Sequence, residues 1–114
     1  MTLPDGNPSY DAYVKKAVFR EVFAGDLPAA TAAVMAATQR PADANALQQA
    51  SGPPAWRGIP SWYLVARDDQ LIPAAAQRFM AQRAGARVTE VRSSHVAMIS
   101  KPDQATAVIL SAAR

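Results

Sequence analysis

The sequence lacks cysteine altogether and contains a single histidine among its 114 residues. Without cysteine the chain can form neither a disulfide nor a thiolate metal site, and it has no cysteine nucleophile. One histidine excludes every site that needs two imidazoles, so a metal would have only carboxylates as further ligands. We therefore expect neither a metal centre nor a bound cofactor.

An excess of one charge and a long hydrophobic run are also missing. Lys and Arg together number 12 against nine for Asp and Glu, and the only adjacent basic pair is Lys15-Lys16. This scatter is unlike the clustered basic surface of a nucleic-acid-binding protein. No apolar run approaches the ~20 residues of a membrane-spanning helix, and residues 1–8 do not resemble a signal peptide. We expect a cytoplasmic protein that binds neither nucleic acid nor membrane.

Half of the residues are hydrophobic, which is enough for a domain with a core at this length. Ser51-Gly52-Pro53-Pro54 divides the chain, since these residues interrupt regular structure. Residues 1–55 are alanine-rich and predict a helical segment, with Ser9 and Asp26 as helix caps. Three helices are predicted here. The first follows Ser9, with Tyr10, Val14, Ala17 and Val18 on one face. The second ends at Arg40-Pro41, with Leu27, Ala30, Val34 and Thr38 on one face, and a short third helix covers 42–50.

Residues 56–114 predict a strand–helix–strand–helix unit. A short run rich in aromatic and β-branched residues over 61–66 indicates a buried strand, and 86–92 a second. Between them, 73–84 has helical spacing with Ala76, Phe79, Met80 and Arg83 on one stripe, and Gly85 suits its end. Residues 93–98 read as a loop, and a last helix follows Ser100. Such a unit joins two parallel strands, which cannot form a stable sheet alone.

Two kinds of acid–base side chain follow the two predicted strands. Asp68-Asp69 comes after the first strand, and His95 comes after the second. Functional groups of α/β sheets lie beyond the carboxyl ends of the strands, so a carboxylate and an imidazole should meet there. In a catalytic triad the imidazole acts as general base and the carboxylate orients it. Asp69 could equally serve as a turn or capping residue before Pro73.

These residues resemble two motifs of the α/β-hydrolase family. Ala66-Arg67-Asp68-Asp69-Gln70-Leu71-Ile72-Pro73 is similar to the family's acid loop, with Ala66 in place of the usual glycine. Residues 94–102, from Ser94-His95 to Ser100-Lys101-Pro102, look like the histidine loop of the carboxylesterase and hydroxynitrile-lyase-like branch. The resemblance implies Asp69 as the acid, with Asp68 the lesser choice, and His95 as the base. Gln39-Arg40-Pro41 and the helix around Gln77 also resemble bacterial members of that branch.

One part of the family pattern is missing. The glycines are Gly6, Gly25, Gly52, Gly58 and Gly85, so the sequence contains no Gly-x-Ser-x-Gly nucleophile elbow. Ser93 and Ser94 are unsuited to replace that serine, because a sequence neighbour of His95 rarely points at its ring nitrogen. The resemblance therefore implies a partial α/β-hydrolase fold: a helical cap or lid over residues 1–55, then the last two parallel βα units over 56–114. The earlier strands are not found in this sequence.

Three functions remain open on this basis. The first is a serine hydrolase acting on small carboxylic esters, in which this chain holds the acid and the base and is inactive alone. The second is a truncated, non-catalytic binding or assembly module, whose sheet edge is covered by a second copy or by an N-terminal segment. The third is lyase chemistry at the same triad. Trp56 and Trp62 are expected to pack in the core rather than to form a substrate platform.

Overall fold

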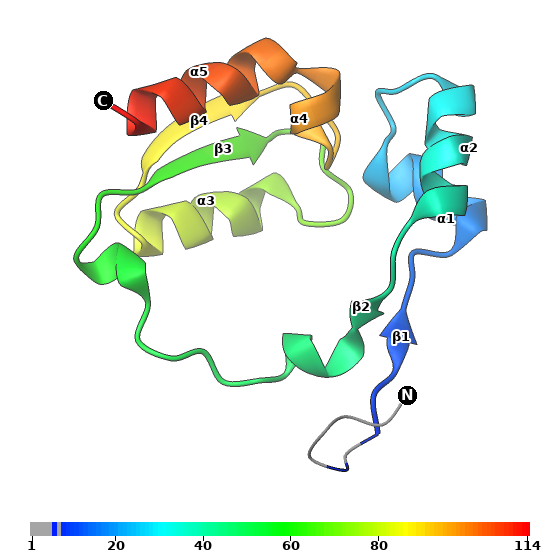
Figure 1. Ribbon diagram of the computed structural model, residues 1–114. Coiled ribbons are helices and arrows are strands. Elements are labelled where there is room, and N and C mark those ends of the chain that lie inside the picture. The colour runs from blue at the N-terminus through cyan, green and yellow to red at the C-terminus, as the bar shows by residue number, and fades with distance from the viewer. Residues whose placement is uncertain (1–5, 7) are drawn as a thin grey trace.

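A computed structural model describes residue 6 and residues 8–114. Most of residues 1–8, which are predicted not to be a signal peptide, therefore lie outside the described residues. β3 (Trp62–Ala66) and β4 (Arg87–Val91) form a parallel pair, with Trp62 opposite Arg87. α3 (Ala74–Arg83) connects them, and Gly85 follows it at a φ of 61°, a conformation that glycine adopts readily. Figure 1 shows the pair between α3 and α5 (Pro102–Ala112). The predicted strand–helix–strand–helix order and the parallel pairing are confirmed.

The loop predicted over 93–98 is shorter in the structure. A four-residue helix, α4 (Ala97–Ser100), begins two residues after His95 and leads into α5. Pro102 occupies the first turn of α5, where its missing N–H has no helical partner to lose. No helix of the described part of the chain is long and apolar enough to span a membrane.

The N-terminal half contains two helices, but they begin later than predicted. β1 (Asp11–Ala12) pairs antiparallel with β2 (Ala42–Asp43), and between them lie α1 (Lys16–Phe23) and α2 (Ala29–Thr38). The predicted caps are wrong: Lys15 and Pro28 precede the helices, without a side-chain cap. The predicted helix over 42–50 is reduced to β2 and a 3₁₀ turn (Ala44–Leu47), and another 3₁₀ turn spans Ala55–Arg57.

The face predicted for the first helix is wrong, because α1 buries Phe19 whereas Ala17 and Val18 are exposed. The predicted faces are also wrong for α2 and α3. Val34 and Phe79 are both 63% exposed, whereas α2 buries Ala32 and Ala36, and α3 buries Gln77 and Ala81. The reason is that these helices lie against other segments through small side chains. In an alanine-rich helix, hydrophobic periodicity does not distinguish the packed face, because every face contains alanine.

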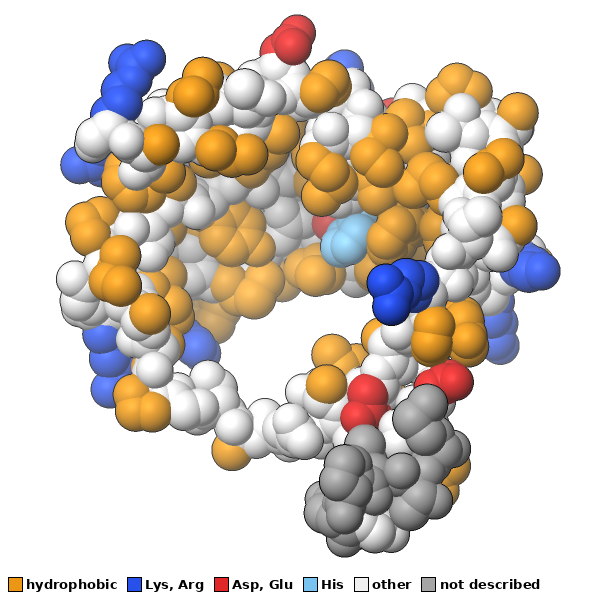
Figure 2. All heavy atoms as spheres, viewed as in Figure 1, with side chains coloured by type: hydrophobic (Ala, Val, Ile, Leu, Met, Phe, Trp, Pro, Cys, Tyr) orange, Lys and Arg blue, Asp and Glu red, His pale blue; other side chains and the backbone are white. Residues whose placement is uncertain are grey.

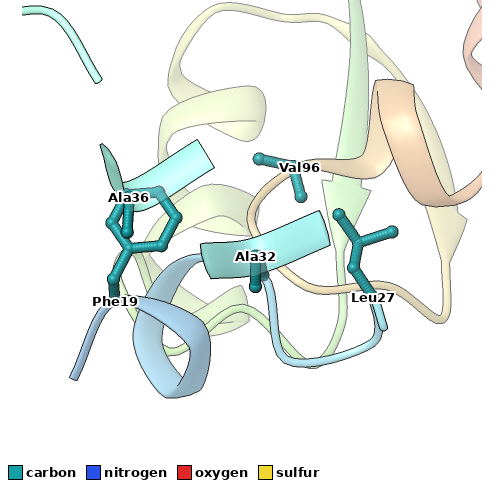
Figure 3. Close-up of a cluster of buried hydrophobic side chains, with 6 residues drawn as sticks. Phe19, Leu27, Ala32, Ala36 and Val96 are labelled. Carbon is teal, nitrogen blue, oxygen red and sulfur yellow. The ribbon is translucent and has the colours of Figure 1, made fainter. Parts of the chain in front are cut away.

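The main buried cluster joins the N-terminal helices to the segment that follows β4. It contains Phe19 of α1, Leu27, Ala32 and Ala36 around α2, and Val96 (Figure 3). Val96 is adjacent to His95 in sequence, so the packing of α1 and α2 also fixes the segment that carries the histidine. Burying such side chains contributes roughly 1.5–3 kcal/mol each for the larger ones.

One edge of β3 has no neighbouring strand among the described residues. Arg67 N donates to Val91 O and Ser61 O accepts from Arg87 N, so the backbone groups of odd-numbered residues face β4. The N–H and C=O groups of Trp62, Leu64 and Ala66 therefore point to the opposite edge. Of these, only the groups of Ala66 find a partner within residues 6 and 8–114, namely the Gln77 side chain.

Candidate active site

Asp69 lies at the end of β3 with its carboxylate almost completely enclosed. The residue is 6% exposed, and its two oxygens accept four hydrogen bonds. Oδ1 accepts from the backbone N–H groups of Leu71 at 2.8 Å and Ile72 at 3.0 Å, which fixes the turn leading to Pro73. Oδ2 accepts from Gln77 Nε2 at 2.9 Å and contacts His95 Nδ1 at 2.8 Å. The turn role and the pairing with the histidine thus fall on different oxygens of one side chain.

Gln77 reaches back from α3 and holds Asp69 in place. Its Nε2 donates to Asp69 Oδ2 and to the backbone oxygen of Ile72, while its Oε1 accepts from Ala66 N at 2.9 Å. The buried amide therefore ties the end of β3, the acid loop and α3 together. A buried polar side chain is tolerated here because its hydrogen-bonding groups are matched.

His95 meets Asp69 from the loop that follows β4. The carboxylate can only accept, so Nδ1 carries the proton of this 2.8 Å bond and Nε2 is left as the acceptor in the neutral ring. Nε2 makes no hydrogen bond to any residue of the described chain. The ring of Phe23 lies against the imidazole with 4.8 Å between the ring centres. The His95 side chain is 26% exposed, which leaves it accessible on one side.

A second link holds the histidine loop to the N-terminal half. Asp26, between α1 and α2, accepts a hydrogen bond from Ser94 N at 3.1 Å. Partial burial raises the pKa of the Asp26 carboxyl, but the polar groups of Ser94 and Ser100 together favour the carboxylate more strongly, and its pKa lies below the usual value. The backbone N–H of Ser94 makes the well-formed bond, whereas the Ser94 hydroxyl lacks good hydrogen-bond geometry.

The other candidates of the sequence occupy different positions. Asp68 points outward, with its side chain 56% exposed and Arg92 3.7 Å away, so it does not share the histidine. Ser93 and Ser94 are buried, and their hydroxyls make no hydrogen bond within residues 6 and 8–114. Trp56 and Trp62 are half-buried under Arg83 and Arg87 rather than enclosed in a core.

His95 opens into a shallow groove of about 370 Å³ along the free edge of β3. Figure 2 shows this histidine at the wall of a hollow among hydrophobic side chains. The groove is lined by Trp62, Tyr63, Leu64, Ala66, Asp69, Ile72, Gln77, His95 and Met98. No group of three or more side chains able to ligate a metal occurs in the described part of the chain.

The sequence indicated Asp69 and His95 but not the residues that position them. Gln77, Phe23 and Asp26 are 8, 72 and 68 positions from their partners, and nothing in their local pattern predicts these contacts. The one available signal is a polar residue among the alanines of α3. The arrangement can accept a proton at Nε2, stabilise the resulting imidazolium through Asp69, and return the proton later.

Comparison with known proteins agrees with this fold. The sequence profile described as the alpha/beta hydrolase family matches residues 2–108, nearly the whole chain. No curated protein and no solved structure matches the sequence.

Proposed function

Because the chain belongs to the alpha/beta hydrolase family, we propose that it carries the acid and the base of a serine hydrolase acting on carboxylic esters. The carboxylesterase-like branch is the one that the two loops resemble. The observation that supports this most directly is the 2.8 Å contact between Asp69 Oδ2 and His95 Nδ1, with Nε2 unpartnered toward an open groove.

In this reaction Nε2 takes the proton of a serine hydroxyl as its oxygen attacks the ester carbonyl. The buried carboxylate stabilises the imidazolium, and the same proton then goes to the departing alcohol. Water, deprotonated by Nε2 in turn, releases the acid and restores the serine. Asp69 needs no movement in this cycle, because Leu71, Ile72 and Gln77 already hold it.

The serine would come from a polypeptide outside this sequence. The free edge of β3 and the groove beside it supply a place where a further strand of the same fold could pair, ending near His95. Residues 10–50 would then form the lid, since α1 contacts the imidazole through Phe23. We infer that this chain alone is inactive toward esters.

A hydrolysis assay with p-nitrophenyl acetate and butyrate tests the proposal. We expect the chain alone to match its His95→Ala variant at background rate. Fusion to a family member's N-terminal segment that carries the nucleophile elbow should create turnover. His95→Ala should then lower kcat/KM by roughly 10³-fold or more, and Asp69→Asn by a comparable factor, while Asp68→Asn has little effect. Turnover in the fusion that survives His95→Ala would contradict the proposal.

An assembly module is the second candidate, favoured by the backbone groups of Trp62 and Leu64, which pair with no residue that the structure describes. Exposed edges of this kind pair with other strands, either in a second copy or in an N-terminal segment. Activity that depends on His95 in the fusion would decide against this alternative.

A further inference from the structure

A second hollow lies in the N-terminal half, separate from the groove beside β3. It encloses about 480 Å³ between α1, α2 and the β1–β2 pair, a volume in the range of small-molecule pockets. We call it the lid pocket. Most of its wall is apolar, and its lining residues are Ala12, Val14, Phe19, Phe23, Met35, Thr38, Gln39, Arg40 and Ala42.

Two of the three polar side chains that line the lid pocket already make hydrogen bonds within the fold. Gln39 bonds both backbone groups of Val14, at 3.0 and 2.9 Å, and thereby closes the pocket between α2 and β1. The hydroxyl of Thr38 donates to Val34 O. Arg40 differs, because its guanidinium makes no hydrogen bond or ion pair with any described residue. The lid pocket therefore combines an apolar body with one cation that pairs with nothing in the part of the chain that the structure describes.

Phe23 connects this pocket with the candidate active site. Its ring lines the lid pocket and also contacts the imidazole of His95, with Phe19 4.9 Å behind it. One face of the lid pocket is therefore a side chain that also touches the base. Phe23 is thus a side chain that the lid pocket and the candidate active site have in common.

We propose that the lid pocket binds a carboxylate-bearing aliphatic chain, with the carboxylate on Arg40 and the ester end at His95. The substrate class is then an aliphatic ester that carries a second, distal carboxylate. Arginine suits this role because its fork of N–H donors matches a carboxylate. The assignment of the ester end to His95 rests on the proposed function. The binding of an aliphatic carboxylate in the lid pocket does not.

Methionine methyl groups provide reporters for the test. Met35 lines the lid pocket, Met98 lines the groove beside β3, and Met80, a residue of α3, lines neither of them. The full chain, labelled with ¹³C at the methionine methyls, is titrated with octanoate and with the neutral octanamide. We expect octanoate to shift Met35 and leave Met80 unchanged, with octanamide about tenfold weaker.

Variants isolate the contribution of Arg40. Arg40→Gln should weaken octanoate about tenfold and leave the Kd of octanamide unchanged, because only the charge pairing is lost. Arg57→Gln, which removes the same charge beside a different hollow, should leave both Kd values unchanged. Shortening octanoate to hexanoate should weaken binding by roughly two- to fourfold per methylene.

Several results would overturn the proposal. One is the absence of any shift of the Met35 methyl signal, or a shift of the Met98 signal in its place. Another is an equal Kd for octanoate in the unsubstituted protein and in Arg40→Gln. Equal loss in Arg40→Gln and Arg57→Gln would do the same, since it would indicate a general charge effect. None of these readouts needs catalysis, so they fail or succeed independently of the esterase assay.

Discussion

The carboxylate of Asp69 accepts three hydrogen bonds in addition to its contact with the histidine. Two backbone N–H groups and the amide of Gln77 fix its orientation, and His95 takes the remaining position. At this scale the sequence predicted the acid and the base, because each lies just after a strand in a recognisable loop. It could not predict Gln77, since a buried amide in a helix has no local pattern that distinguishes it from an exposed one.

Replacing Gln77 should affect stability as well as the site. Gln77→Ala leaves Ala66 N and O unpaired in a buried region and removes one partner of Asp69. We expect the free energy of unfolding to fall by about 1–3 kcal/mol. Urea denaturation followed by circular dichroism measures the change. Gln82→Ala, at an exposed position of the same helix, is the control, and an equal loss in both variants would refute the role given to Gln77.

At the scale of elements, the N-terminal helices and the histidine loop are one packed unit. Val96 lies in the cluster formed by α1 and α2, and Asp26 bonds the backbone beside His95. The sequence predicted the strands, their parallel pairing and the helices between them. It misplaced the cap at Asp26, because this side chain bonds a residue 68 positions away in place of its own helix. It misplaced the helix faces because alanine occurs on every face of these helices.

The lowered pKa of Asp26 predicts a dependence of stability on pH. A carboxyl whose pKa is lower in the folded chain stabilises it above the unfolded pKa of about 3.9, and this contribution is lost as pH falls through the folded pKa. Glu90 behaves in the same way because Arg78 hydrogen-bonds it at 2.6 and 2.8 Å and lowers its pKa.

Urea titrations between pH 7 and pH 3 test this prediction. We expect the chain to lose stability below about pH 5, and Asp26→Asn or Glu90→Gln each to lose less over that interval. The double variant should have the flattest profile. At neutral pH Asp26→Asn should cost less than about 1 kcal/mol, since the side chain is exposed. Identical pH profiles for the chain and Asp26→Asn would contradict the Asp26–Ser94 link.

The alternation along β3 gives a further prediction. Leu64 N–H points to the free edge and Tyr63 N–H points to β4, so proline removes a ladder bond only at position 63. We expect Leu64→Pro to retain the circular dichroism of the chain and to lose any self-association through this edge, as measured by sedimentation velocity. Tyr63→Pro should unfold this unit. Undiminished association of a folded Leu64→Pro variant would place the contact elsewhere.

The molecule as a whole is less compact than a globular domain of the same length. Its accessible surface is 8284 Å², compared with ~6,000 Å² for a compact monomer of this mass. Its radius of gyration is 16.2 Å, compared with ~13 Å for a globular domain of this length. Figure 1 shows the N-terminal helices beside the end of the sheet, with the connecting segment looping away from both. These values suit a chain that completes its core with further strands, as we propose.

Composition could not reveal this openness, since half of the residues are hydrophobic and the length suits one domain. The motifs, in contrast, indicated it. They predict two βα units, and two strands are too few for a sheet with both edges covered. The lid pocket could not be predicted at all, because its wall combines residues of β1, α1 and α2 that meet only after folding.

The most direct test of the central claim is the protonation of the single histidine, read by ¹⁵N NMR of the imidazole. In the neutral ring we expect the proton on Nδ1, bonded to Asp69, and Nε2 unprotonated and able to act as a base. Asp69→Asn should abolish this preference, whereas Asp68→Asn should preserve it. A ring protonated on Nε2 at neutral charge, or one unaffected by Asp69→Asn, would contradict the account.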